Sequence, residues 1–337
     1  MYNKCMEGIS KDILTQQRQR LRLFIKRWML PISMLTGAAT YLLYAQIPLP
    51  NHCRHMVGVA VSVVQPLLIF AMLFVTLCKV DLRQLRPRRW HLPALLLQVL
   101  LFVSFALLHT LTANAEIRIV LEAAMLCFIC PTATAAAVVT QKLGGDAAAL
   151  TAYVMLINLV TSLLVPITVP LLQIGEETMH FGSAFLQILI KVFPLLIGPL
   201  LAAMLVRKFC PRFRQAVTAR RDLAFHIWAV ALALAIAMTV RSLVNSDVPF
   251  AVLASIALVS LLACALQFWM GRLIGRRHGS TVAASQALGQ KNTVLAIWMG
   301  FTFFTPVTSL AGGFYSIWHN VYNAHQLHRH EKRQTEN

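Results

Sequence analysis

The sequence predicts an all-α polytopic membrane protein. Hydrophobic residues make up 58% of the 337 residues and charged residues only 12%, which is about half the charged fraction of a typical soluble domain. Apolar runs of roughly 20 residues, the length that spans a bilayer as a helix, recur along the whole chain. Two of these runs are interrupted by short polar stretches. Unwound backbone at membrane depth survives only where it lines a protein-walled or watered cavity.

Ten apolar stretches separated by polar connections predict ten transmembrane helices. Taken in order, the predicted spans are Met29–Ala45, Met56–Leu77, His91–Leu111, Ile117–Val139, Ala147–Leu172, Ser183–Val206, Asp222–Leu243, Val248–Arg272, Thr281–Phe301 and Thr302–His325. The basic N-terminal segment, residues 1–28, and the tail, residues 326–337, lie outside these spans.

The distribution of Lys and Arg predicts the orientation. With these spans, 25 of the 30 Lys and Arg residues fall on the same side as the two termini. Cytoplasmic loops of membrane proteins are enriched in Lys and Arg, so we expect both termini in the cytoplasm and the chain in the plasma (inner) membrane. The net charge of +18 is explained by this topology, and nucleic-acid binding is excluded because no aromatic platform or fold motif accompanies the basic residues.

The chain divides into two halves of similar length. Five spans cover residues 29–172, a short extracytoplasmic linker covers 173–182, and five more spans cover 183–325. An odd number of spans inverts the second half relative to the first. In each half the polar interruption falls in the fourth span, at Pro131-Thr132-Ala133-Thr134 and at Gly289-Gln290-Lys291-Asn292-Thr293. Two inverted five-helix repeats with crossing broken helices four and nine are a known transporter architecture.

The remaining motifs point away from catalysis. The sequence contains no Ser-His-Asp grouping, P-loop or H-E-x-x-H, so we expect neither an enzyme nor an ATP-driven pump, and no cofactor or metal. Cys127 and Cys130 form a C-x-x-C inside an apolar helix, where small buried thiols are expected to pack as apolar groups. The histidines near the C-terminus, among them His325 and His330, are expected in a solvated tail.

Both interruptions resemble the bile acid:sodium symporter family. The stretch Cys130-Pro131-Thr132-Ala133-Thr134-Ala135-Ala136-Ala137-Val138 is similar to that family's C-P-G-G-T-A-S-N-V. The stretch Gly289-Gln290-Lys291-Asn292-Thr293-Val294-Leu295-Ala296 is similar to its E-x-G-x-Q-N-x-G-L-A. The resemblance covers nearly the whole chain. It implies a secondary transporter of bile acids or other organic anions, in which spans three to five and eight to ten move against the remaining spans.

The resemblance also implies two sodium sites, and this chain lacks most of their ligands. The Ser, Asn, Glu and Gln of the two family motifs fall on Ala136, Ala137, Ala287 and Lys291. Gln98 and Thr151 align with two further ligand positions, and Gln286 is the polar neighbour of Ala287. Sodium requires several oxygen ligands, and methyl groups supply none. We therefore expect the first sodium site to be absent.

Lys291 is the most informative departure. It lies about ten residues into its predicted span, close to the middle of the bilayer, where a Lys costs about 2.5 to 3.5 kcal/mol on insertion scales. Its ammonium could be held by unwound carbonyls or by the electronegative C-terminal ends of half-helices. We predict that Lys291 substitutes for the sodium ion of the second site. If Lys291 loses its proton during the cycle, the coupling ion is a proton; if it stays charged, the protein is a uniporter or an exchanger.

An anionic substrate is expected at the electropositive ends of the broken helices, opposite the electronegative ends that hold Lys291. Free backbone N–H groups there create positive potential, and the residues that supply them are Thr132, Ala133, Thr134, Asn292 and Thr293. Glu122 lies four residues after Arg118, so an intrahelical ion pair is expected for it. Two alternatives stay open. Sodium coupling persists with rearranged ligands such as Gln98, Gln286, Gln290 and Thr134, or the protein is a non-transporting receptor or scaffold on the same fold.

Overall fold

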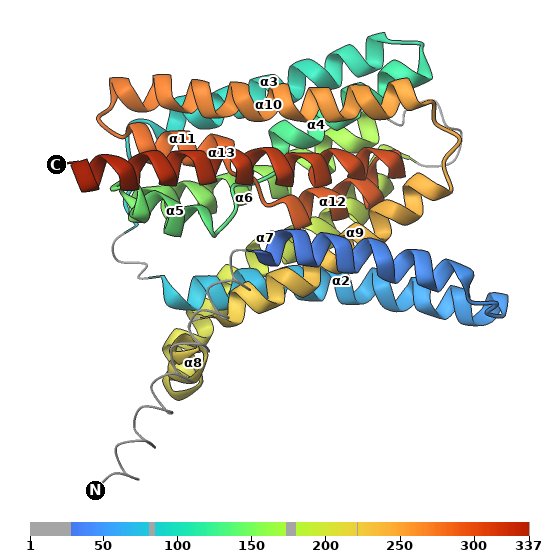
Figure 1. Cartoon of the computed structure of the whole chain (residues 1–337), viewed down its shortest axis with the longest axis horizontal. Helices are drawn as coiled ribbons and strands as arrows, with labels where there is room; N and C mark the ends of the chain where they lie inside the picture. Colours follow the sequence, from blue (N-terminus) through green and yellow to red (C-terminus); the bar gives the residue numbers. More distant parts are fainter. Residues whose placement is uncertain (1–27, 81–84, 173–179, 221, 337) are drawn as a thin grey trace, which may run out of the picture.

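The computed structural model describes residues 28–80, 85–172, 180–220 and 222–336, and every regular element among them is a helix (Figure 1). The first helix occupies residues 28–46. Helices α3 (His91–Leu111) and α6 (Ala147–Leu172) have the predicted bounds. Four more lie within five residues of the predicted spans at either end: α2 (Asn51–Lys79), α7 (Phe181–Phe209), α9 (Leu223–Val244) and α10 (Phe250–Arg277).

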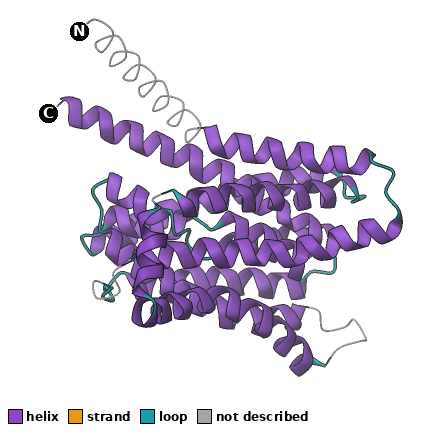
Figure 2. Ribbon diagram, turned by 90° about the horizontal axis from the view of Figure 1, so that it is seen from below, coloured by secondary structure: helices purple, strands orange, loops and turns teal. Residues whose placement is uncertain are grey.

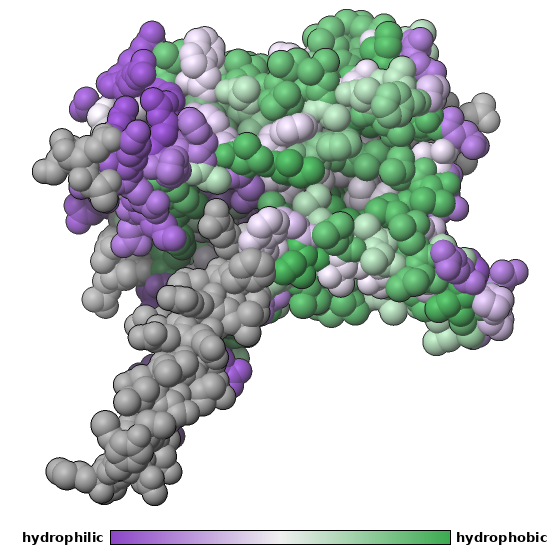
Figure 3. All heavy atoms as spheres, viewed as in Figure 1, coloured by the Kyte–Doolittle hydropathy of each residue, from purple (hydrophilic) through white to green (hydrophobic). Residues whose placement is uncertain are grey.

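Six of these helices are long and apolar enough to cross a bilayer: α2, α3, α6, α7, α9 and α10. They run roughly side by side (Figure 2). Their outward faces carry many exposed Leu, Val, Ile and Phe side chains, and apolar surface covers the middle of the molecule (Figure 3). In water such a surface would drive aggregation. The chain is therefore a multi-pass helical membrane protein.

The helices form two groups, which Figure 1 shows one above the other. In the lower group α2 packs against α7 and α9, and the helix over residues 28–46 approaches α9 so closely that Gly37 lies against the backbone of Ala233. In the upper group α10 packs against α4 (Ala115–Ile129), α11 (Thr281–Gly289) and α13 (Ser309–Glu336). Contacts of α6 with α7, and of α12 (Thr293–Phe303) with α9, join the two groups.

Both expected helix interruptions are confirmed. The first separates α4 from α5 (Ala136–Lys142), and the second separates α11 from α12. Helix α4 ends where it does because proline disfavours helical geometry in the residue before it, and Cys130, which precedes Pro131, has ψ 129°. Gln290 leaves α11 with an extended backbone at φ −97° and ψ 102°.

One predicted boundary is wrong, and two further helical segments were not predicted. The connection after α7 contains a short helix, α8 (Pro211–Ala219), which begins with proline at a position that needs no N–H donor. A tenth span does not follow the ninth directly, because Pro306 starts the 3-10 turn η2 (Pro306–Thr308) before α13 begins. Helix α13 then continues to Glu336, so the predicted tail is helical through that residue. Residues 1–27 of the predicted N-terminal segment and 173–179 of the predicted linker lie outside the described residues.

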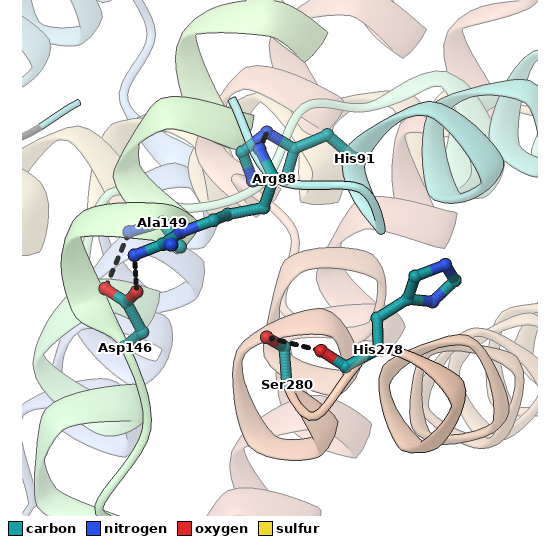
Figure 4. Close-up of polar contacts among 6 residues, drawn as sticks. All are labelled: Arg88, His91, Asp146, Ala149, His278 and Ser280. Carbon is teal, nitrogen blue, oxygen red and sulfur yellow. Dashed lines mark hydrogen bonds and ion pairs between the residues drawn. The ribbon is translucent and has the colours of Figure 1, made fainter. Parts of the chain in front are cut away.

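The start of α6 matches its prediction because a side chain caps it. Asp146 Oδ1 accepts a 2.9 Å hydrogen bond from the backbone N–H of Ala149, and Oδ2 accepts one of 3.0 Å from Arg88 Nη2 (Figure 4). The Arg88–Asp146 pair is largely exposed, and exposed ion pairs contribute little stability. The N-cap is therefore the stronger determinant of where this helix begins.

Candidate functional site

The two interruptions meet each other inside the helical bundle. An antiparallel β-bridge joins Thr132 of the first interruption to Lys291 of the second. Two backbone hydrogen bonds of 2.9 Å close it, from Ala133 N–H to the Gln290 carbonyl and from Asn292 N–H to the Pro131 carbonyl. Helix α11 has nine residues and is thus about 14 Å long. That length is close to half the roughly 30 Å hydrocarbon core of a bilayer, which fits the expectation of a bridge near mid-depth.

Side chains from four other segments cap the C-terminal end of α4. The last carbonyls of a helix have no partner within the helix. Here Gln267 Nε2 donates to the Cys127 carbonyl over 3.2 Å, Lys291 Nζ to the Phe128 carbonyl over 3.3 Å, and Thr161 Oγ1 to the Ile129 carbonyl over 3.0 Å. Just beyond the helix, Gln98 Nε2 donates to the Cys130 carbonyl over 3.3 Å. These bonds explain how unwound backbone is tolerated at this depth.

The C-terminal end of α11 is capped by hydroxyl groups. Thr132 Oγ1 donates to the Ala287 carbonyl, and Tyr315 OH donates to the Gly289 carbonyl over 2.9 Å. The Tyr315 hydroxyl in turn accepts a 3.1 Å hydrogen bond from Gln267 Nε2, which also donates to Cys127 at the end of α4. The ends of the two half-helices therefore share one hydrogen-bonded network.

We expect Thr161→Val to lower the free energy of unfolding by about 1–3 kcal/mol, because it leaves the buried Ile129 carbonyl without its donor. Val keeps the size and branching of Thr. Thr151→Val, ten residues earlier on α6, is the matched control, since the Thr151 hydroxyl bonds only to Ala147 in its own helix. The thermal midpoints of both purified variants in detergent would check this. Equal midpoints would show that the Thr161 bond does not support the interruption.

Lys291 is buried at this crossing, with 1% of its surface exposed. Its ammonium donates to the Phe128 carbonyl, at the end of α4 where the helix dipole is negative. The buried thiols of Cys127, Cys130 and Cys264 lie near it. Among the described residues no carboxylate pairs with it. The site thus contains one buried cationic side chain held by neutral groups.

The three alanines that the resemblance aligns with sodium-ligand positions lie among apolar residues. Ala136 and Ala287 are fully buried in one cluster that also contains Trp90 and Tyr153, and Ala137 packs against it. The Ala287 carbonyl already accepts the Thr132 hydroxyl. These three alanines contribute only methyl groups to the packing beside the crossing.

Three glutamines of the predicted site lie at or near the crossing. Gln98 uses both ends of its amide, because its Oε1 accepts from Tyr153 OH over 3.0 Å. Gln286 Nε2 donates to Asn323 and to Gln326 of α13, each over 2.9 Å. Gln286 Oε1 and Gln290 Oε1 are buried and have no hydrogen-bond partner among the described residues. The Gln290 acceptor belongs to the second interruption, and the Gln286 acceptor lies one turn earlier on α11, beside α13.

Of the other predicted site residues, Asn292, Thr293 and Thr134 lie in or beside the two interruptions, and Thr151 does not. Asn292 Oδ1 accepts from Leu295 N–H and caps α12, and Thr293 is buried as the first residue of that helix. Thr134 is half-buried in the first interruption. The structure gives Thr151 no contact with the crossing, because its hydroxyl bonds to Ala147.

One part of the anion-site prediction is wrong. The N–H groups of Ala133 and Asn292 are used by the backbone bridge. The remaining predicted donors are the N–H groups of Thr132, Thr134 and Thr293, for which no acceptor occurs among the described residues.

Glu122 does not pair with Arg118, contrary to expectation. Its carboxylate lies 3.4 Å from His109 Nε2 of α3 and accepts a 2.9 Å hydrogen bond from Thr305 N–H. Arg118 instead donates to the Thr112 carbonyl over 2.5 Å. Sequence spacing favoured the neighbour on the same helix, and nothing in the sequence indicated His109, which is brought in by the packing of α3 on α4.

A cavity of about 480 Å³ lies between the two groups of helices. Tyr41, Arg54 and Arg241 line it from the lower group, and Phe301 and Thr305 from the upper group. Thr305 is also the residue that donates to Glu122. The cavity opens at the end of the molecule where α10 begins, since Val248 also lines it.

Comparison with known proteins identifies the family. Residues 66–248 match the family model described as "Sodium Bile acid symporter family", a range that contains the first interruption and ends before the second. The "Uncharacterized sodium-dependent transporter YocS" of Bacillus subtilis (strain 168) is 25% identical over 229 residues, which cover 65% of this chain and 66% of that protein, just under two thirds of its length. The chain belongs to the sodium bile acid symporter family.

Proposed function

We propose that the protein is a secondary transporter of small or amphipathic organic anions that works by alternating access. Membership of a transporter family, two interrupted helices that meet at mid-depth, and a cavity between two groups of helices support this proposal. Secondary transporters bind their substrates at discontinuous helices near the midplane of the bilayer. The substrate would bind beside the crossing, near the free N–H groups of Thr132, Thr134 and Thr293.

The proposed architecture is ten spans in two inverted repeats. The arrangement of α3, α4 with α5, and α6 would correspond to that of α10, α11 with α12, and α13, which is supported by an interruption in the middle helix of each set. These helices would form the moving core. The helix over residues 28–46 would form the opposing panel with α2, α7 and α9. Both termini would lie in the cytoplasm and the protein in the plasma (inner) membrane, as the Lys and Arg distribution indicates.

The proposed mechanism rests on the position of Lys291. A buried ammonium without a carboxylate partner occupies the C-terminal pole of α4 and is held by a carbonyl oxygen, as a bound metal cation would be. We infer that it replaces the sodium ion at this site, and that transport is sodium-independent. If the ammonium releases its proton during the cycle, transport is coupled to protons. If it remains charged, the protein is a uniporter or an exchanger.

Sodium coupling with rearranged ligands is the second candidate. It is favoured by the two buried, unpartnered acceptors Gln286 Oε1 and Gln290 Oε1, and by the name of the Bacillus relative, a sodium-dependent transporter. Gln98 is a poorer ligand because both ends of its amide are already bonded.

Uptake into proteoliposomes tests the proposed function. We expect at least one organic acid from a panel of taurocholate, pantoate and a 2-keto acid to accumulate in potassium medium without sodium. Separate sodium and pH gradients then identify the coupling ion. Binding of an anion without uptake under either gradient would favour a receptor or scaffold.

Sodium binding can be examined without a substrate. We expect the thermal midpoint of the purified protein to be the same in sodium and potassium chloride at equal ionic strength, because a ligand that binds only the folded state raises the midpoint. A saturable rise that is specific to sodium would contradict the role given to Lys291 and support the glutamine ligands.

A further inference from the structure

A second cavity, of about 500 Å³, lies at the opposite end of the molecule from the first. It is an open cavity lined by α10, α11 and α13, with Leu143 of the loop after α5 also lining it. The residues of α10 that line it, Arg272 and Arg276, lie in the last two turns of the helix. None of its lining residues comes from the helix over residues 28–46 or from α2, α7 and α9. The cavity is therefore separate from the proposed path between the two groups of helices.

The lining of this cavity is strongly basic. Six basic side chains contribute to it: Arg272, Arg276, His325, Arg329, His330 and Arg333. No carboxylate lines it, and the four guanidinium groups have no ion pair with the described residues. One of them, Arg272, lies 5.8 Å from the ring centre of Tyr322. Figure 3 shows the corresponding hydrophilic surface at the left, where Figure 1 places the C-terminus.

The arginines that line the cavity come in two pairs, and each pair lies on one face of its helix. Arg272 and Arg276 are four residues apart on α10, and Arg329 and Arg333 are four residues apart on α13, so each pair lies on one helical face. Like charges at this spacing destabilise a helix by a few tenths of a kcal/mol. The topology of a membrane protein requires basic residues at this end, but it does not require them to converge on a cavity. A bound anion removes the repulsion within both pairs.

The backbone at the start of α11 adds further donors. Thr281 and Val282 line the cavity, and Ala284 is the first residue of α11 whose N–H bonds back, to the Ser280 carbonyl. The Ser280 side chain does not cap the helix, because its hydroxyl is directed at the His278 carbonyl (Figure 4). The first N–H groups of α11 are thus available at the wall of the cavity. Free N–H groups at a helix N-terminus favour phosphate and other anions.

We propose that this cavity binds a phosphate group, either of a soluble organic phosphate or of an acidic phospholipid headgroup. The guanidinium fork matches phosphate oxygens in two-bond geometry, and a volume of this size accepts a small organic phosphate or a headgroup. The bound group bridges α10, α11 and α13. Gln326 lines the cavity and accepts a hydrogen bond from Gln286 of α11, so the ligand also steadies the half-helix that leads to the crossing.

The test compares two neighbouring arginines. Arg276 and Arg277 are both exposed, but only Arg276 lines the cavity. The thermal midpoint of the full chain in neutral detergent is measured against inorganic phosphate, glycerol phosphate, and short-chain phosphatidylglycerol or phosphatidylcholine, with chloride adjusted to constant ionic strength. We expect saturable stabilisation of the parent protein by a phosphate probe. Apparent affinity should fall about tenfold in Arg276→Gln, the scale of one lost charged hydrogen bond, and stay unchanged in Arg277→Gln.

The outcomes also separate the two sources of phosphate. Stabilisation by phosphatidylglycerol alone assigns the cavity to a lipid headgroup, and stabilisation by glycerol phosphate as well assigns it to a soluble ligand. Without any probe, Arg276→Gln should be at least as stable as the parent, because one like-charge contact is removed. The proposal is wrong if no phosphate probe stabilises the parent, if phosphatidylcholine is as effective as phosphatidylglycerol, or if Arg277→Gln loses as much affinity as Arg276→Gln.

Discussion

Replacing Lys291 with Gln is expected to lower the uptake of an organic anion by about fiftyfold at low substrate concentration. An ammonium and a carboxylate about 7 Å apart attract each other by about 2.4 kcal/mol at an effective dielectric constant of about 20, and this corresponds to about fiftyfold in affinity. Gln keeps an uncharged donor, one bond nearer the backbone than the Lys291 ammonium that bonds to the Phe128 carbonyl in the parent. The variant thus removes the charge and keeps a polar side chain. Initial uptake rates in proteoliposomes would measure the effect.

Lys191→Gln is the matched control, because Lys191 lies within α7 and its side chain is exposed. We expect its uptake to equal that of the parent. The thermal midpoints separate a loss of charge from a loss of fold. Lys291→Gln should stay folded, and sodium should stabilise it, because the place of the ammonium is then open to a metal cation. Unchanged uptake in Lys291→Gln would remove this residue from the mechanism.

The C-terminal ends of α4 and α11 at the crossing are capped by different groups, and this difference supports a single cation site. The end of α4 is capped by the Lys291 ammonium together with neutral donors. Among the described residues, the side chains that donate to the end of α11 are the hydroxyl groups of Thr132 and Tyr315. Both ends carry the same partial negative charge of the helix dipole, so the charge of Lys291 is not required merely to satisfy the backbone. An uncharged donor would have been enough, as it is at α11.

The positions of most spans and of both interruptions could be predicted from the sequence, because they depend on local signals. Apolar runs set the lengths of α3 and α6, and Asp146 marks the start of α6 with its side chain. Pro131 ends α4 through a steric effect on the residue before it. The extension of α13 could not be predicted in this way, since its last turns are polar and carry no apolar run.

The partners at the crossing could not be predicted, because they are distant in the sequence. Gln267 lies 140 residues from Cys127, and Lys291 lies 163 residues from Phe128. Their pairing depends on how α10 and the second interruption pack against α4. The same reason explains why sequence spacing favours Arg118 as the partner of Glu122, whereas the structure pairs Glu122 with His109. Local spacing indicates which side chains can meet on one helix, but not which helices become neighbours.

Gly271→Leu is expected to destabilise the protein more than any other substitution considered above, because α10 and α11 touch at this glycine. A Cβ atom at Gly271 would lie 2.5 Å from the Ala284 carbonyl oxygen and 2.7 Å from the Ser285 Cα, and one at Gly275 would lie 2.6 Å from the Thr281 Cα. These are backbone atoms, so no side-chain rotation relieves the overlap. Close helix approach through small residues four positions apart is typical of membrane helix packing.

Gly271→Ala isolates the steric effect. Ala adds one methyl group and favours a helix over Gly by about 1 kcal/mol, whereas overpacking a close contact costs about 1–3 kcal/mol. We therefore expect Gly271→Ala to lower the thermal midpoint, and Gly182→Ala on α7, whose Cβ would meet nothing within 4 Å, to leave it unchanged or raise it. Because α11 leads into the second interruption, Gly271→Ala should also weaken anion uptake. Equal stability of the two alanine variants would show that α10 and α11 are not in close contact, and the position of Lys291 would then lose its support.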